Sequence, residues 1–402
     1  MSKVTPAARM SRVSASPSAL ASQRARELRA EGADVIALSS GEPDFQPPPH
    51  VIEAAHAAML AGQTKYTTMS GTAELKQAII EKFRRENNLD YSASEVMVST
   101  GAKQVIFNAF MATVETGTEV IIPAPYWIAY EQIVQLAGGT PRIVSCDADT
   151  NFKLDAEKLE RAITPATKWL VLNSPSNPSG AVYTADELAE LAAVLLKHPH
   201  VWVMTDDIYE HIIFDGRRAA TIAAVEPQLK DRTVTINGVS KTYAMTGFRI
   251  GYCGGPAPMM AEMLKMQSQS TSGPSSVGQA AALAALTGPQ DVLAERAQAF
   301  QARRDLVVPL LNQTVGLTCR SPEGAFYVYP NCAGLIGKKT PQGQTIETDR
   351  DFVMHVMDQH GVAMVHGEAY GLSPHFRLSI AASLEDLQRG CERIKRAASE
   401  LI

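Results

Sequence analysis

The chain has 402 residues and lacks the sequence features of disulfide-rich, membrane-spanning and nucleic-acid-binding proteins. Its five cysteines are scattered, odd in number and never spaced as CxxC, so the sequence indicates neither a zinc site nor a disulfide framework. No run of about 18 apolar residues occurs, so we expect no membrane span. A net charge of −5 offers no broad basic surface to nucleic acid. These absences predict a cytoplasmic protein that binds no metal, membrane or nucleic acid.

The N-terminal segment, residues 1–21, lacks the apolar core of a secretory signal, although it carries Lys3, Arg9 and Arg12. It is also rich in serine, and the first acidic residue is Glu27, a composition that transit peptides share. The sequence therefore argues against secretion and leaves organelle targeting open.

Helical patterns alternate with short runs that are rich in Val and Ile and bounded by turn residues, as in parallel strands covered on both faces. The predicted strands are 96–99, 119–123, 140–144, 169–173, 201–205, 233–237 and 250–253. The clearest predicted helices are 19–30, 49–61, 102–114, 185–197 and 257–269. We expect an α/β fold, a mostly parallel seven-stranded sheet sandwiched by helices, with ligands beyond the carboxyl ends of the strands.

The pattern changes after about Arg304. Short strand-like runs at 324–329, 362–365 and 376–380 accompany helices at 350–359 and 384–401. This predicts a smaller α+β domain, made of residues 1–45 and 305–402, beside a large domain of residues 46–304. The segment 337–350 is interpreted as a surface loop or as an elaboration of the small domain, and we assign it no function.

The segment Asn237-Gly-Val-Ser240-Lys241 places a lysine directly after an apolar strand. Its amine must lose a proton to attack a carbonyl, and the ordinary pKa near ~10.4 prevents that at neutral pH. Partial burial, or a cationic neighbour such as Arg249, lowers the pKa of such a lysine and permits a covalent imine. The alternative is a lysine that caps the end of a strand.

Two further strand ends carry polar groups. Asp206 and Tyr209 follow the strand 201–205, and a carboxylate there can keep a pyridine ring protonated, so that the ring withdraws electrons. The alternative for Asp206 is a helix N-cap. Asn177 lies in the turn Ser174-Pro-Ser-Asn177-Pro-Ser-Gly180, where extended X-Pro geometry presents its amide, unless the turn is a plain loop.

The turn Ser99-Thr-Gly101-Ala102-Lys103-Gln104 joins a strand to a helix. Small residues at a helix start leave backbone N–H groups free to hold a phosphate. Turns of this kind are also common without any ligand, so the motif alone is a weak indication.

Taken together, these motifs resemble the fold-type I aminotransferases that use pyridoxal 5′-phosphate, within the bacterial aspartate aminotransferase subgroup that includes prephenate aminotransferases. The resemblance covers nearly the whole chain, from Pro17 to the C-terminal helix. Its specific marks are GEPDF at 41–45, KYT at 65–67 with SG at 70–71, PYW at 125–127, NSPSNPSG at 173–180, DDIY at 206–209, SK at 240–241 with Arg249, and FRLS at 376–379.

The resemblance implies roles around the cofactor ring. Lys241 would hold the cofactor as an imine and move a proton between the substrate α-carbon and the cofactor. Asp206 would pair with the pyridine N–H, and Asn177 and Tyr209 would donate hydrogen bonds to the ring oxygen O3′. Trp127 would stack on the face of the ring and line the substrate site.

The resemblance also assigns the cofactor phosphate. The backbone amides of Gly101 and Ala102 would hold it together with Ser240 and the planar fork of Arg249. Tyr66 would reach the phosphate of a neighbouring subunit, which implies a homodimer with shared sites. Tyr66 is equally compatible with an ordinary interface residue.

For the substrate, the resemblance implies that Arg377 binds the α-carboxylate as a bidentate pair, helped by Asn177 and the backbone of Gly41. Lys103 would bind the distal carboxylate, unless it is a solvent-exposed helix residue. Hydroxyls assist Lys103 in this subgroup, and they fall at Ser16 and Ser18. The departures from the pattern of the subgroup are Ser18, where Thr is usual, Phe248, where Trp is frequent, Thr242, where Ala is common, and Ser179, where Thr is common.

The predicted reaction is ping-pong transamination through pyridoxamine phosphate, between L-aspartate or L-glutamate and 2-oxoglutarate or oxaloacetate. Prephenate or an aromatic amino acid is the alternative within the class. A pyridoxal-phosphate lyase or racemase, and a cofactor-sensing regulator without turnover, are alternatives outside it. The pair of carboxylate anchors, Arg377 and Lys103, favours transamination of small dicarboxylic amino acids.

Overall fold

The computed structural model describes residues 4–402, and within this range the central feature is a seven-stranded sheet of order β2-β8-β7-β6-β5-β3-β4. Its strands are β2 (Val96–Ser99), β3 (Glu119–Ala124), β4 (Thr140–Ser145), β5 (Thr167–Asn173), β6 (Trp202–Asp206), β7 (Thr233–Gly238) and β8 (Gly251–Gly254). Only β8 runs against both of its neighbours, β2 and β7. The predicted fold class is confirmed, and the observed strand ends differ from the predicted ones by one or two residues.

The sheet is covered on both faces because alternate residues of each strand enter different hydrophobic cores. In β5, Trp169 and Val171 pack with residues of α4 (Ala102–Thr113) and α5 (Ala129–Ala137). Leu170 and Leu172 point to the opposite face and pack with residues of α6 (Ala156–Ala162) and α7 (Ala185–Lys197). A side-chain period of two, with apolar residues on both sides, thus produces the buried parallel sheet.

The remaining helices of this body are α2 (Pro49–Leu60), α3 (Ala73–Asn87), α8 (Ile222–Val225), α9 (Ala257–Ser270) and α10 (Ser276–Thr287). Some helix starts carry side chains that satisfy their free N–H groups. The hydroxyl of Thr184, for example, accepts from the amide of Glu187, whose carboxylate accepts in return from the amide of Thr184. This capping box therefore helps to fix where α7 begins.

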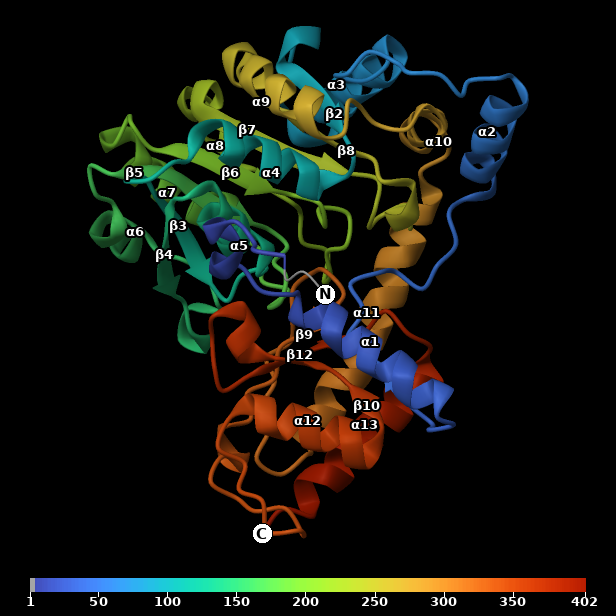
Figure 1. Ribbon diagram of the computed structural model, residues 1–402, viewed down its shortest axis with the longest axis vertical. Coiled ribbons are helices and arrows are strands. Elements are labelled where there is room, and N and C mark those ends of the chain that lie inside the picture. The colour runs from blue at the N-terminus through green and yellow to red at the C-terminus, as the bar shows by residue number, and fades with distance from the viewer. Residues whose placement is uncertain (1–3) are drawn as a thin grey trace.

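A second body lies below the sheet in Figure 1 and contains both N-terminal and C-terminal segments. It holds α1 (Pro17–Ala30), α12 (Asp349–His360) and α13 (Leu384–Ser399), the parallel pair β1 (Ile36–Ala37) and β10 (Val362–Ala363), and a three-stranded sheet of β11 (Val365–His366), β12 (Phe376–Ser379) and β9 (Tyr327–Val328). The long helix α11 (Asp291–Asn312) runs between the two bodies (Figure 1). The domain ranges 46–304 and 1–45 with 305–402 stay a prediction.

Two predictions for this second body are wrong in detail. Residues 362–365 do not form one strand, because the chain changes partner at Met364: β10 pairs with β1, whereas β11 pairs with β12. The strand predicted at 324–329 is reduced to β9, because Ala325 has a positive φ of 57° and Gly324 forms only an isolated bridge with Ile213. Changes of partner and backbone kinks of this kind carry no signal in hydrophobic periodicity.

The segment 337–350 is more than a surface loop. Ile346 is fully buried, Lys339 forms an isolated bridge with Thr345, and the backbone of Lys339 is hydrogen-bonded in both directions to Ile402 at the C-terminus. This segment therefore ties the end of the chain to the second body. Across residues 4–402, no helix is long and apolar enough to cross a membrane.

Candidate active site

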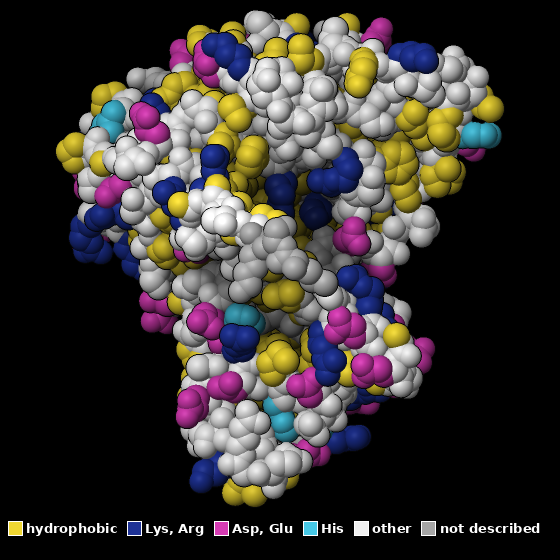
Figure 2. Space-filling view, viewed as in Figure 1, with side chains coloured by type: hydrophobic (Ala, Val, Ile, Leu, Met, Phe, Trp, Pro, Cys, Tyr) yellow, Lys and Arg dark blue, Asp and Glu magenta, His cyan; other side chains and the backbone are white. Residues whose placement is uncertain are grey.

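A cavity of about 450 Å³ opens where the carboxyl ends of the parallel strands face the second body. Figure 2 shows a hollow in the middle of this face in which Lys and Arg side chains gather. Of the residues predicted for the site, those that line the cavity are Ser16, Ser18, Gly41, Ala102, Lys103, Trp127, Asn177, Asp206, Tyr209, Ser240, Lys241, Arg249 and Arg377. An acidic chain thus concentrates positive charge at one place.

Lys241 stands three residues beyond β7 and is partly buried in the wall of this cavity. Burial lowers the pKa of its ammonium group to about 8, with the cationic Arg377 and Arg249 adding to that effect and the carboxylates of Glu42 and Asp206 opposing it. Its Nζ donates a hydrogen bond of 2.7 Å to the carbonyl oxygen of Gly41. With a pKa of about 8, roughly a tenth of Lys241 is a neutral amine at pH 7, and this neutral form is the nucleophile.

Asp206 is the last residue of β6 and is 4% exposed. Its Oδ2 accepts a hydrogen bond of 2.7 Å from the hydroxyl of Tyr130, while its Oδ1 is buried without a partner among residues 4–402. Burial raises the pKa of Asp206 to about 6, and the hydrogen bond from Tyr130 works against that rise. A buried carboxylate oxygen at a cavity wall is suited to pair with a cationic N–H of a ligand.

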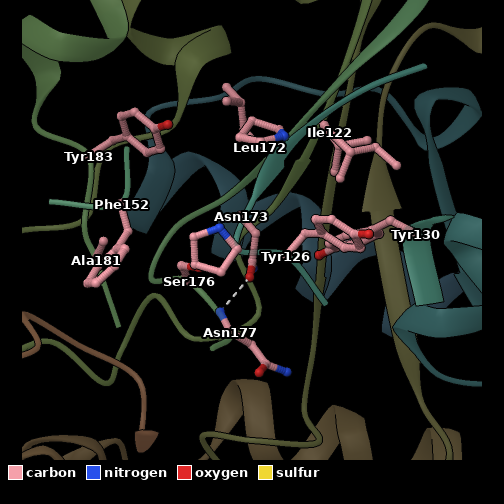
Figure 3. Close-up of a pocket in the computed structure, with 13 residues that line it drawn as sticks. Ile122, Tyr126, Tyr130, Phe152, Leu172, Asn173, Ser176, Asn177, Ala181 and Tyr183 are labelled. Carbon is pink, nitrogen blue, oxygen red and sulfur yellow. Dashed lines mark hydrogen bonds between the residues drawn. The ribbon is translucent and has the colours of Figure 1, made fainter. Parts of the chain in front are cut away.

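Asn173 supports Asp206 from the neighbouring strand, because its Nδ2 donates to the backbone oxygen of Asp206 at 2.7 Å. Its Oδ1 accepts from the backbone amide of Asn177 at 2.8 Å, which fixes the start of the turn (Figure 3). Asn173, Asn177 and Tyr130 also line a second, much smaller cavity of about 30 Å³, which is large enough for about one water molecule. One asparagine thus links two strand ends of the site.

Arg377 in β12 is 2% exposed and reaches the same cavity from the second body. Its two terminal nitrogens donate to Asn177 Oδ1 at 3.0 Å and to the carbonyl oxygen of Ser39 at 2.7 Å. Its Nε has no partner within the described part of the chain. Tyr327 and Tyr370 hold the guanidinium between their rings, at 4.4 and 5.1 Å from the ring centroids. An immobilised guanidinium of this kind is suited to grip a carboxylate.

The turn at residues 99–104, which is predicted to hold a phosphate, follows β2. Its geometry depends on glycine. Gly101 has φ of +87°, and an added Cβ there would collide with the guanidinium of Arg249. An added Cβ at Gly251 would collide with the backbone amide of Ala102. Arg249 itself is held by a 2.8 Å hydrogen bond from Nη1 to the carbonyl oxygen of Thr246. The turn and the guanidinium therefore lie close enough to bind one anion together.

Lys103 lies with its ammonium group 4.8 Å from the centroid of the Trp127 ring. Burial and the nearby Arg249 lower the pKa of Lys103. Lys103 is nevertheless exposed to solvent, so its role as an anchor for the distal carboxylate stays a prediction beside the alternative of a solvent-exposed helix lysine. On the same side of the cavity, the hydroxyl of Ser18 lies 3.4 Å from that of Tyr370, and Ser16 precedes α1.

Tyr66 is not part of the cavity in one chain. It is 97% exposed and lies in the loop between α2 and α3. Exposed apolar side chains of the same region are Ile52, Met59, Leu60 and Met69. The predicted role of Tyr66 requires a second copy of the chain, so it stays a prediction.

The sequence motifs missed two tyrosines. Tyr130 supports Asp206, and Tyr327 contacts Arg377 and forms a 3.0 Å hydrogen bond with the hydroxyl of Tyr209. Tyr130 lies near the start of α5, and Trp127 precedes that helix, so helical spacing did not distinguish Tyr130 from an ordinary core aromatic. Tyr327 lies in a short strand whose position beside the site depends on the packing of the second body.

A buried ionic cluster lies behind the strand ends. The ammonium group of Lys82 in α3 forms a salt bridge with Glu210, whose carboxylate also accepts 2.6 Å hydrogen bonds from Asn87 and Asn237. Lys82 is 1% exposed and Glu210 is 7% exposed. Glu210 adjoins Tyr209, and Asn237 precedes the turn to Lys241. The cluster therefore ties α3 to the segments that carry two site residues.

The fold and cavity define the class: an α/β enzyme with a desolvated lysine and anion-binding groups at the carboxyl ends of a mostly parallel sheet. The chain matches the family model "Aminotransferase class I and II" over residues 33–394. It is 55% identical over 387 residues to a probable aspartate/prephenate aminotransferase from Rhizobium leguminosarum bv. phaseoli, covering 96% of this chain and 97% of the relative. The chain belongs to the class I and II aminotransferases.

Solved structures agree with this assignment. The aspartate aminotransferase from Rhizobium meliloti is 54% identical, with a TM-score of 0.96 and full coverage of both chains. The aspartate aminotransferase from Thermus thermophilus with maleate is 38% identical, with a TM-score of 0.91, and covers 98% of this chain and 100% of that chain. The predicted family and the prediction of an aminotransferase are confirmed.

Proposed function

We propose that the protein transfers the amino group of L-aspartate or L-glutamate to 2-oxoglutarate or oxaloacetate with pyridoxal 5′-phosphate as cofactor. The observation that carries this proposal is the presence of two cationic anchors, Arg377 and Lys103, in the cavity that holds the desolvated Lys241. A substrate with two carboxylates has a partner for each of them there. The relatives named as aspartate aminotransferases support the same substrate class.

The residues present fit the proposed cofactor. The unpartnered Oδ1 of Asp206 suits a protonated ring nitrogen, and the turn at Gly101 and Ala102, with Ser240 and Arg249, suits a phosphate. Trp127 supplies a flat face at the cavity wall. When bound, this cofactor supplies an aldehyde for amines and a ring that withdraws electrons from the reacting carbon.

Residues of the chain account for proton transfer, for contacts to the cofactor ring and for orientation of the substrate. Lys241 would hold the cofactor through its neutral amine, and its Nζ would move the proton at the substrate α-carbon. Asp206 would pair with the ring nitrogen and favour its charged form, while Asn177 and Tyr209 would donate hydrogen bonds to the ring oxygen. Arg377 orients the α-carboxylate, and its burial keeps the guanidinium in one position.

The distal carboxylate falls to Lys103, with Ser16 and Ser18 as hydrogen-bond donors and the backbone of Gly41 lining the substrate side. Lys103 has no carboxylate partner among the ion pairs found in residues 4–402, so its charge is available to a ligand. The same group lies over the Trp127 ring, and this aromatic wall supports prephenate as a second candidate acceptor. The aspartate/prephenate name of the Rhizobium leguminosarum relative favours that candidate too.

The proposal includes a homodimer in which Tyr66 donates to the cofactor phosphate of the partner. It is supported by the 97% exposure of Tyr66 and by the exposed apolar side chains around it. We also propose the cytoplasm as the compartment, since all five cysteines are buried free thiols. Residues 46–304 are proposed as the cofactor-binding domain, and residues 1–45 with 305–402 as the small domain.

The test is the visible spectrum of the purified protein, titrated separately with aspartate, phenylalanine and arogenate. Loss of the band of the lysine-bound cofactor at low aspartate concentration is the expected result. A preferential response to arogenate or phenylalanine would move the substrate to the prephenate or aromatic branch. Absence of such a band after addition of the cofactor, or normal turnover by Lys241→Ala, would overturn the proposal.

A further inference from the structure

The second body contains a group of ligand-type side chains that the proposed reaction does not use. Asp349 begins α12, His366 ends β11, and Glu368 lies in the single turn η7 (Gly367–Tyr370). One carboxylate oxygen or imidazole nitrogen from each residue lies within 4.8 Å of the others. We propose that these three residues form a binding site for a divalent transition-metal cation such as Zn²⁺, although the cysteine pattern predicts none.

The carboxylate of Asp349 is held in the way that is typical of a metal ligand. The residue is 1% exposed, and its Oδ2 accepts three hydrogen bonds: 2.7 Å from the hydroxyl of Ser373, and 3.2 Å each from the amides of Glu368 and His375. Its Oδ1 is buried and has no partner within residues 4–402. Three donors thus fix the carboxylate through one oxygen and leave the other oxygen available, as outer contacts do for metal ligands.

His366 supplies a second buried atom in need of a partner. Its Nδ1 is buried, accepts or donates no hydrogen bond in the described part of the chain, and lies 3.9 Å from Oε2 of Glu368. The unpartnered nitrogen therefore lies in the same group as the two carboxylates, where an ion would provide the contact that the protein does not.

Glu368 completes the group from the solvent side. Its side chain is 67% exposed, so rotation of its bonds can bring Oε2 closer to an ion. Ligand atoms around tetrahedral Zn²⁺, at ~2.0–2.1 Å from the metal, lie about 3.4 Å apart, which requires a small contraction of the present group. A surface cavity of about 450 Å³, lined in part by Asp349 and Glu368, provides a path of entry.

The chemistry of the three ligands selects the kind of ion. Two carboxylates neutralise a dication, and an imidazole nitrogen favours Zn²⁺ and its neighbours over Mg²⁺ or Ca²⁺, which prefer oxygen alone. Three protein ligands leave a fourth position for water. A second group among the described residues, Glu86, Glu210 and His211, differs because the ammonium group of Lys82 already forms salt bridges with both of its carboxylates.

The experiment is equilibrium dialysis of the chelator-treated holoenzyme against ZnCl₂, with His366→Ala and Glu368→Gln as test variants. Glu347→Gln, at the same cavity, and His200→Ala, on the other body, are matched controls because both residues are exposed and outside the group. We expect one Zn²⁺ per chain for the wild type and both controls, and an affinity about tenfold or more lower for both test variants.

A second measurement separates binding from misfolding. Zn²⁺ should raise the thermal unfolding temperature of the wild type and not that of Glu368→Gln, whose exposed side chain leaves the fold intact. Co²⁺ in place of Zn²⁺ should give visible absorption bands that the test variants lack. Equal Zn²⁺ binding by wild type and Glu368→Gln, or none by the wild type, would overturn the site. These readouts do not depend on transamination, so they also distinguish failure of this site from failure of the proposed activity.

Discussion

Tyr130 donates its hydroxyl proton to Oδ2 of Asp206 at 2.7 Å, and Oδ1 of the same carboxylate points to no partner among residues 4–402. One oxygen of this buried carboxylate is thus bound by the protein, and the other oxygen is available to a ligand. Burial alone would hold the carboxylic acid neutral at higher pH, and the tyrosine opposes that effect. The ionisation of Asp206 therefore depends on a residue that lies on a different element.

We predict that Tyr130→Phe shifts the acid limb of the pH profile of kcat/KM to higher pH. A hydrogen bond to a charged group contributes about 1.5–3 kcal/mol, which corresponds to about one to two pKa units. Its loss raises the pKa of Asp206 above the present value of about 6, so less of the carboxylate is ionised at pH 7. Activity should fall at pH 7 and recover towards the wild-type value near pH 9.

The control is Tyr126→Phe, because the Tyr126 hydroxyl donates to Glu131 rather than to Asp206. This variant should keep the wild-type pH profile. An unchanged acid limb in Tyr130→Phe would show that the tyrosine does not set the ionisation of Asp206.

A second prediction concerns Lys241, whose pKa burial lowers to about 8. Only the neutral amine attacks an aldehyde, so the rate at which cofactor-free protein captures pyridoxal 5′-phosphate should rise from pH 6, reach half its maximum near pH 8 and level off above about pH 9. Stopped-flow absorbance measures this rate. Pyridoxamine 5′-phosphate has no aldehyde, and its binding rate should not follow the same curve. A capture rate that keeps rising to pH 10 would contradict the lowered pKa.

The sequence predicts the site best where function requires polar residues at strand ends. Asp206, Lys241 and Asn177 lie at or just after the ends of apolar strands, so a pattern of local sequence is enough to find them. Tyr130 and Tyr327 could not be found in the same way, because an aromatic residue near a helix start or in a strand is ordinary core composition. Their roles arise only when separate elements pack together.

The fold shows the same difference between features that local sequence predicts and features that depend on tertiary packing. Seven runs of Val and Ile predict the large sheet because parallel strands are apolar on both faces. The split between β10 and β11 at Met364 escapes such reasoning, since both halves are buried and apolar and only their partners differ. The three-residue group at Asp349 also escapes it, because its members are 19 positions apart in the sequence at their widest and join only through tertiary structure.

A third prediction tests the distal anchor. Lys103→Met keeps the length of the side chain and removes its charge, so the KM for aspartate should rise by about 10–100-fold, as the loss of a charge-assisted hydrogen bond of about 1.5–3 kcal/mol implies. The KM for phenylalanine should change little, because that substrate has no distal carboxylate. Steady-state kinetics with both donors provide the comparison. Equal losses for both donors would remove this role from Lys103.

A fourth prediction tests the shared site. Tyr66→Phe removes one hydroxyl from a side chain that is 97% exposed in the single chain, so folding should not change. The dissociation constant for pyridoxal 5′-phosphate should rise by about fivefold to thirtyfold, the effect of about 1–2 kcal/mol. Light scattering should still find a dimer. An unchanged dissociation constant would mean that Tyr66 is an ordinary interface residue.

The last prediction concerns the buried salt bridge between Lys82 and Glu210. Lys82→Met leaves the carboxylate of Glu210 buried without its cation, which should lower the free energy of unfolding by about 3–5 kcal/mol. Adding Glu210→Met removes the unpaired charge and should recover part of that loss, so the two effects are not additive.

Urea unfolding of the single and double variants measures these differences, and Lys395→Met on an exposed face of α13 is the control for loss of a lysine. Full recovery is not expected, because Asn87 and Asn237 lose their acceptor when Glu210 is replaced. The remaining deficit therefore measures what the amides contribute. If the two single-variant losses simply add in the double variant, the two charges do not interact. The cluster would then contribute through its amides only.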